Sequence, residues 1–217
     1  MKTPRQKSHI RPQTKEHLQG LIGAEIEQLG NQCDLNHIDV SLVTDFSYLF
    51  FMSNFNGDIS KWNVSKAVHM DSMFSCSEFN GDISKWDVSG VTDMISMFCL
   101  SEFRGNIFGW NVSSVVSMDS MFYKSKFNGD ISRWDPTKVI NMYKMFEGSK
   151  FNSNISNWNR SAIKNDTDMF LKSALAKNMN LKNPSFDQAK SHFLALHLAE
   201  NLEKSSPLQP GLLKVRL

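Results

Sequence analysis

Aspartate recurs at one fixed place in the sequence, and such a column of carboxylates is the feature that most resembles a metal site. Asp58, Asp82 and Asp130 each follow Asn-Gly and precede Ile-Ser. Oxygen ligands stacked at successive turns are typical of calcium-binding β-rolls, whose repeat is about nine residues long. That short repeat is missing, and the same column holds the uncharged Asn106 and Asn154. We therefore predict Asx turns, in which these side chains accept hydrogen bonds from their own backbone, and no metal.

No other set of residues has the spacing of a catalytic or metal site. The histidines are not arranged as metal ligands, and His192 and His197, five residues apart, do not share a helix face. The sequence contains no G-x-S-x-G, P-loop, G-x-G-x-x-G or H-E-x-x-H motif. The 12 methionines suit core filling rather than copper ligation. We predict a protein that is not an enzyme and has no cofactor, with a calcium-dependent or enzymatic protein as the lesser alternative.

A repeat organises the sequence. FNGDISKW occupies residues 55–62 and again 79–86, a shift of 24 residues, and FNGDISRW occupies 127–134. A degenerate sixth unit begins near Asn31. Units of this kind bury their apolar side only by stacking on one another, so their shared residues form the core. All 5 tryptophans stand at the same position of successive units and are predicted core residues: Trp62, Trp86, Trp110, Trp134 and Trp158.

Within one unit, the apolar spacing predicts a short strand followed by a short helix. Trp62 and Val64 are two residues apart, as on a strand with one buried face. Met70 and Met73 are three residues apart, as in a short helix or 3₁₀ segment. We therefore predict an α/β repeat, a leucine-rich-repeat-like solenoid of six strand-helix rungs of 24 residues, over residues 31–174.

The turns before three of the predicted strands contain an Asn-Gly pair. Asn56-Gly57 is the first example, and we expect Gly57 to adopt a positive φ there. We expect the asparagine side chains to close the same turns internally. The members of that set are Asn56, Asn80, Asn128 and Asn152.

The pattern F-N-x-D-I-S-x-W-D-V-S-x-V-x-x-M-x-x-M-F resembles the BspA-like family of bacterial leucine-rich-repeat surface proteins, over residues 31–170. Repeats of about this length also occur in mycoplasma lipoproteins. The resemblance implies a leucine-rich-repeat solenoid at the cell surface that is used for adhesion or other protein contacts. It brings no catalytic residues.

The two ends of the chain are predicted to cap the solenoid, and the alternative is that the C-terminal helix docks a partner. Residues 1–30 read as a basic, disordered tail of about a dozen residues, followed by a helix from Thr14 to Leu29. Residues 175–217 read as a second helix, from Pro184 to about Lys204, and a tail. Its predicted apolar face is Phe186, Ala189, Phe193, Leu196 and Ala199.

Composition limits the partners and the compartment. A net charge of +2 gives no indication of nucleic-acid binding, and no apolar stretch is long enough to span a bilayer. No signal peptide is visible, so the default location is cytoplasmic, and only the family resemblance implies a surface or secreted one. The 3 cysteines are an odd number without paired spacing, which predicts buried free thiols. The oligomeric state is not indicated.

The outward side chains of the predicted strands are the candidate partner-binding residues. They alternate with Trp and Val, and a rigid sheet offers many contacts at little ordering cost. The third unit departs most from the repeat, because it reads FRGNIFGW and places an exposed phenylalanine beside arginine, a combination typical of binding hot spots. The predicted residues are Lys61, Asn63, Lys85, Asp87, Arg104, Phe108, Asn111, Arg133 and Asp135.

We therefore predict a non-enzymatic module that binds a protein through its strand face. The alternatives are an exported effector or a toxin-neutralising protein. Mutual pairing of surface lysines and aspartates, or neutral decay of the repeat, would explain the same residues without a partner.

Overall fold

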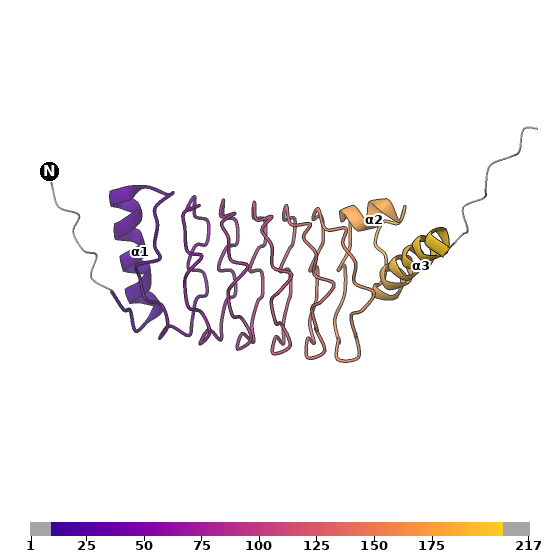
Figure 1. Ribbon diagram of the computed structural model, residues 1–217, viewed down its shortest axis with the longest axis horizontal. Coiled ribbons are helices and arrows are strands. Elements are labelled where there is room, and N and C mark those ends of the chain that lie inside the picture. The colour runs from indigo at the N-terminus through magenta and orange to yellow at the C-terminus, as the bar shows by residue number, and fades with distance from the viewer. Residues whose placement is uncertain (1–9, 206–217) are drawn as a thin grey trace, which may run out of the picture.

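The computed structural model describes residues 10–205, and in it the repeats form a row of similar coils with helices at both ends (Figure 1). Helix α1 (Lys15–Leu29) lies at the N-terminal end of the row. Helices α2 (Ala174–Asn178) and α3 (Phe186–Ser205) lie at the other end, where α3 points away from the coils. The predicted tails over residues 1–9 and 206–217 lie outside the described residues.

Each coil has two legs. The Trp leg runs from the Phe of the FNGDISKW-type segment to the Val after Trp, which is residues 55–64 in one coil. The Met leg carries the Met-Phe pair, residues 68–76 in the same coil. Successive Met legs are joined by isolated parallel bridges such as His69 to Asp93, and the N–H of Phe74 donates to the oxygen of Met97 at 2.9 Å. The coils therefore stack so that each residue lies beside its equivalent in the next repeat.

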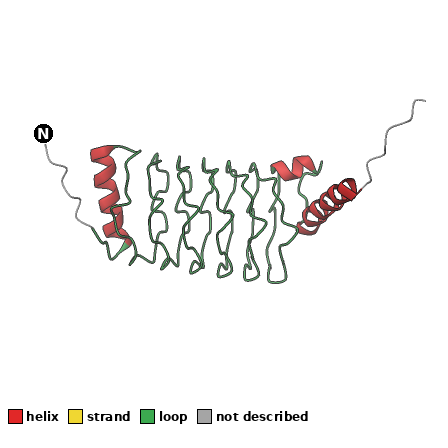
Figure 2. Ribbon diagram, in the orientation of Figure 1, coloured by secondary structure: helices red, strands yellow, loops and turns green. Residues whose placement is uncertain are grey.

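The predicted strand-helix, leucine-rich-repeat solenoid is wrong. The described residues contain three helices, none of them inside a coil, and isolated bridges in place of strands (Figure 2). The backbone ladder that continues along the stack follows the Met legs, where we predicted helices. On the Trp legs, where we predicted strands, the described residues of successive coils form a bridge only between the first two coils, from Asp34 to Asp58.

Backbone conformation explains why neither element forms. Along a Met leg, the N–H groups of Ser72 and Phe74 donate to the next coil, whereas those of Met73 and Ser75 close turns within their own coil. Ser72 and Cys76 also have φ values of 54° and 56°. A left-handed residue at every fourth position interrupts both a strand and a helix.

The core lies between the two legs of the coils. All five tryptophans are at most 4% exposed, and the rings of Trp62 and Trp86 stack with centroids 6.4 Å apart. The phenylalanines form parallel columns, in which Phe74 lies 5.6 Å from Phe98 and Phe79 lies 6.4 Å from Phe103. Equivalent residues of successive coils thus pack on one another and make one continuous interior.

The glycine of the Asn-Gly pair is needed for space and not for a positive φ, so that prediction is wrong. Among the described glycines, only Gly30 and Gly148 have a positive φ. A Cβ atom added to Gly105 would lie 2.7 Å from Cε2 of Phe103, too close for an ordinary contact. The motif therefore keeps glycine because the Phe ring of the same motif packs on it.

The N-terminal end follows the prediction for the helix but not for the residues before it. The side chain of Thr14 accepts a hydrogen bond from the N–H of His17, and α1 buries Leu18 and Ile22. Before the helix, Ile10 forms a parallel bridge with Ile38, and Arg11 pairs with Asp39 at 3.1 Å. The part of the predicted disordered tail that the structure describes is therefore attached to the first coil.

The C-terminal end contains the predicted helix and one that sequence reasoning missed. Ser185 and Gln188 form a capping box at the start of α3, with bonds of 3.2 Å and 2.8 Å. The predicted face is buried only at its first three members, because Leu196 is 48% exposed and Ala199 is exposed as well. The short α2 was not predicted, although Ser173 caps it.

Candidate protein-binding surface

The outward side chains of the Trp legs form one surface, which we call the Trp face. Because Trp and Val point inward, the residues next to them point to solvent. Lys61, Lys85 and Arg133 are exposed on this face, one coil or two coils apart. The predicted residues thus lie on a face made of turns, such as the one closed by the N–H of Trp62 and the oxygen of Ile59, and not on a sheet.

The Asp and Asn residues that follow each tryptophan fix these turns. Oδ1 of Asp87 accepts bonds from the hydroxyl of Ser89 at 2.6 Å and from its N–H at 3.1 Å. These two bonds lower the pKa of the Asp87 carboxyl. The other predicted residues of this column accept the same backbone bond from the residue two positions later: Asn63, Asn111 and Asp135. Their first role is therefore structural.

The repeated aspartates before the tryptophans form Asx turns, which confirms the prediction. Oδ1 of Asp82 accepts the N–H of Ser84 at 2.9 Å, and Asp130 does the same with Ser132 at 2.8 Å. The bond from the Ser84 backbone is the main cause that lowers the pKa of Asp82. The carboxylates stabilise the turn that their own backbone makes.

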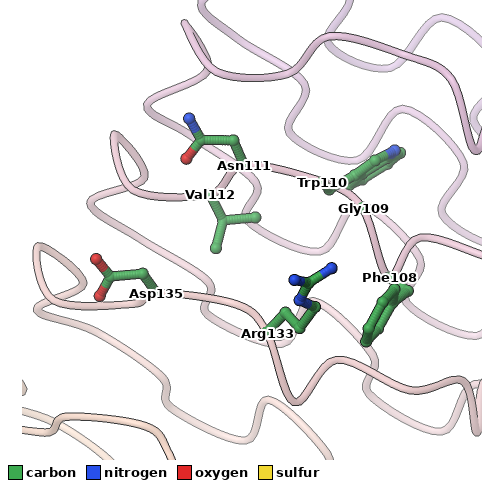
Figure 3. Close-up of a pocket in the computed structure, with 7 residues that line it drawn as sticks. All are labelled: Phe108, Gly109, Trp110, Asn111, Val112, Arg133 and Asp135. Atoms are coloured by element: carbon green, nitrogen blue, oxygen red, sulfur yellow. The ribbon is translucent and has the colours of Figure 1, made fainter.

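The regular column of basic side chains is interrupted at Gly109, and a hollow of about 280 Å³ opens there. A Cβ atom added to Gly109 would meet nothing within 4 Å, so the space is open to solvent. Figure 3 shows Phe108 and Arg133 on one side of the hollow and Asp135 on the other. The lining residues are Phe108, Gly109, Trp110, Asn111, Val112, Arg133 and Asp135.

Phe108 and Arg133 form the chemically distinctive part of this hollow. The guanidinium carbon of Arg133 lies 5.3 Å from the centroid of the Phe108 ring, a cation–π contact, and Phe108 is half-buried rather than fully exposed. The N–H of Phe108 donates to Oδ1 of Asn106 at 3.0 Å, which fixes the turn. Within the described part of the chain, Arg133 forms no salt bridge, so its donors are available to a partner.

The remaining predicted residues do not all join this hollow. Lys61 and Asn63 line a second hollow of about 390 Å³, next to Ile38 and Val40 of the preceding coil. Arg104 lies apart from both, because its guanidinium contacts Glu102 at 3.4 Å and neither hollow includes it. Of the predicted residues, Phe108, Asn111, Arg133 and Asp135 line the hollow at Gly109.

One group of possible ligands was missed by sequence reasoning. His69, Asp71 and Asp93 offer ligand atoms that all lie within 4.8 Å of one another. Burial raises the pKa of the Asp71 carboxyl, and the charge of Asp93 raises it further. The usable signal was the repeat itself, because His69 and Asp93 are one period apart and stacking places them side by side.

The three cysteines differ in their exposure to solvent. Of the three cysteines, only Cys33 is buried, and Cys76 is exposed, so the prediction of buried thiols is wrong for Cys76.

Within residues 10–205, none of the helices combines the length and the apolar composition that crossing a bilayer requires.

Comparison with known proteins identifies a family. A family model described as "Mycoplasma protein of unknown function, DUF285" matches residues 23–126 and 99–205. This match confirms the predicted relation to a mycoplasma repeat family but does not extend to the BspA-like leucine-rich-repeat proteins. No curated protein and no solved structure matches the chain.

Proposed function

We propose a function for this chain, which belongs to the family of Mycoplasma proteins of unknown function DUF285: it binds a protein partner through the Trp face, without catalysis. The observation that carries the proposal is the hollow at Gly109, where the repeat is broken and Phe108 lies beside Arg133. Aromatic and arginine side chains dominate the energetics of protein interfaces.

The size and chemistry of the hollow favour a protein as the partner. At about 280 Å³ it is smaller than the ~300–1,000 Å³ of sites that enclose small molecules, and it is open to solvent at Gly109. Such a hollow accommodates one side chain of a larger partner. The apolar ring of Phe108 would contact that side chain, and the guanidinium of Arg133 would bind a carboxylate next to it.

The rigidity of the face also supports binding. The Asx turns at Asn111 and Asp135 hold the rim of the hollow through backbone bonds of 3.1 and 3.2 Å. Because these turns are already formed, binding a partner costs little conformational entropy at this rim. The flanking Lys61 and Lys85 are exposed, and they add positive charge along the same face.

The experiment has two stages. Affinity isolation of the full chain from the cell that makes it, followed by mass spectrometry, supplies candidate partners, and each purified candidate is then tested by calorimetry. Gly109→Lys fills the hollow with the side chain that other coils carry, and Phe108→Ala removes the ring. We expect both variants to weaken binding at least tenfold, with unchanged melting temperatures.

The matched control is Asn157→Lys, which adds the same side chain in the same column but away from the hollow. This variant should bind within twofold of the unmodified chain. If Gly109→Lys and Phe108→Ala bind every candidate as well as the control does, the Trp face is not the binding site and the proposal fails.

A further inference from the structure

A second surface, separate from the Trp face, carries an ordered set of charged side chains. One column of side chains follows the edge of the stack on which α2 lies, at the top in Figure 1, since the last member of the column is the first residue of α2. We call it the edge column. From the first coil to the last, its members are Asn54, Glu78, Glu102, Lys126, Lys150 and Ala174.

Backbone hydrogen bonds fix the register of the edge column. The N–H of Glu102 donates to the oxygen of Ser77 at 3.1 Å, and the N–H of Lys126 donates to the oxygen of Ser101 at 3.1 Å. Glu78, Lys150 and Ala174 make the same contact with their preceding coils. The four charged side chains are all exposed, and they lie on successive coils at ~4.8 Å per coil.

The order of charges is self-complementary. Two acidic residues are followed by two basic ones, and a neutral residue stands at each end. Reading the column backwards exchanges every acid for a base, which is the relation that a two-fold axis between Glu102 and Lys126 imposes on two copies.

We propose that this edge is a self-association site: two copies of the chain pack antiparallel, edge against edge, about that axis. Glu78 then faces Lys150 of the second copy, and Glu102 faces Lys126 of the second copy. A parallel arrangement in register is disfavoured, because it would place each charge opposite an identical one.

The neighbouring side chains are compatible with such contact. Leu100 and Met52, two residues before Glu102 and Asn54, are 49% and 69% exposed and provide apolar area beside the charges. Glu102 is paired with Arg104 at 3.4 Å, but both side chains are more than half exposed, and exposed pairs of this kind contribute little to stability. Glu102 can therefore give up its contact with Arg104 and pair with a lysine of the second copy at little cost in free energy.

Charge reversal tests the proposal on the full chain. Sedimentation equilibrium at low ionic strength should show a dimer that dissociates as salt screens the charges. Glu78→Lys with Glu102→Lys makes the edge column wholly basic, and Lys126→Glu with Lys150→Glu makes it wholly acidic. Each double variant should be monomeric, with the dimer dissociation constant raised at least tenfold.

Recombination of the variants separates specific pairing from general repulsion. An equimolar mixture of the two double variants should form a 1:1 heterodimer by native mass spectrometry. The variant with all four reversals restores the self-complementary order and should again form a homodimer. Lys61→Glu with Lys85→Glu, an equal change of charge on the Trp face, should leave the dimer intact.

Circular dichroism melting checks that every variant folds, and Glu78→Gln with Glu102→Gln gives a milder change that should weaken the dimer without repulsion. A monomer at all concentrations for the unmodified chain, or a mixture that stays monomeric, would overturn the proposal. Because the edge column is separate from the Trp face, failure of the self-association proposal would leave the proposed partner binding unaffected.

Discussion

The indole nitrogen of Trp86 donates a hydrogen bond to the backbone oxygen of Ile59, 3.2 Å away on the preceding coil. The other four tryptophans each make the same bond with the coil that precedes them: Trp62 to Leu35, Trp110 to Ile83, Trp134 to Ile107 and Trp158 to Ile131. A buried N–H or C=O group without a partner is costly. The indole therefore fills the core and joins two coils at once, which phenylalanine at that position would not do.

Replacing Trp86 by phenylalanine should show this double role. Trp86→Phe keeps an aromatic ring but removes the donor, leaves the Ile59 carbonyl without that partner and reduces core volume. We expect the free energy of unfolding, measured in urea, to fall by about 2–3 kcal/mol. Phe108→Leu, at the half-buried surface position, should change it by less than about 1 kcal/mol. Equal losses in the two variants would contradict a special role for the indole.

Two neighbouring glycines should respond differently to the same substitution. Gly105→Ala brings a Cβ within 2.7 Å of the Phe103 ring, and such overpacking costs about 1–3 kcal/mol of folding free energy. Gly109→Ala meets nothing within 4 Å and should be neutral or slightly stabilising. Thermal or urea unfolding of both variants tests the difference. If Gly105→Ala proves as stable as Gly109→Ala, the close approach of the ring does not explain the motif.

A ladder of asparagine side chains is interrupted at Arg104. The amide oxygen of Asn56 accepts the N–H of Asn80 at 2.8 Å, and that of Asn80 accepts the N–H of Arg104 at 2.7 Å. Asn128 resumes the series with Asn152 at 2.7 Å. The side chains of Asn56, Asn80 and Asn128 bond to the next coil, so the prediction that they close their own turns is wrong for these three residues.

Restoring the ladder should stabilise the protein. Arg104→Asn supplies the missing acceptor for the N–H of Asn128, and we expect the free energy of unfolding to rise by about 0.5–1.5 kcal/mol. Arg104→Ala removes the same guanidinium without adding an amide, and it serves as the control. A gain of the same size in both variants would show that loss of the arginine, and not the new bond, is responsible.

Asp71 should make stability depend on pH in the opposite sense to the Asx-turn aspartates. Burial, and then the charge of Asp93, raises the pKa of Asp71 above its ordinary 3.8. The folded protein therefore favours the protonated carboxyl. The stability that protonated Asp71 contributes is lost as pH rises through the raised pKa. Asp71→Asn should stabilise the protein at pH 7 by up to about 0.5 kcal/mol, discounted for solvent screening, and give no gain at pH 3.

The measurement is chemical denaturation at the two pH values, in EDTA so that no cation occupies the group formed with His69 and Asp93. Asp82→Asn is the matched control, because the pKa of Asp82 is lowered and its ionised form stabilises the fold above the ordinary pKa. That variant should lose stability at pH 7. A gain at pH 7 in both variants would point to general relief of negative charge.

The sequence alone determined the period, the stacking and the contents of the core. Trp, Phe and Met at fixed positions have to pack on their equivalents, because a single unit cannot bury them, and this holds whatever path the backbone takes. The Asx turns at Asp58, Asp82 and Asp130 were predictable for a similar reason: they depend on residues two positions apart.

Only the tertiary structure decided the path of the backbone and the bonds between coils. Spacing of two and three residues predicted strands and helices, but the N–H of Ser72 bonds to Ile95 of the next coil while its φ of 54° breaks either element. The approach of Phe103 to Gly105, the bond from Trp86 to Ile59 and the grouping of His69 with Asp93 likewise depend on how one coil or leg sits against another. A linear pattern states which residues are buried, whereas the geometry between coils determines what each of them contacts.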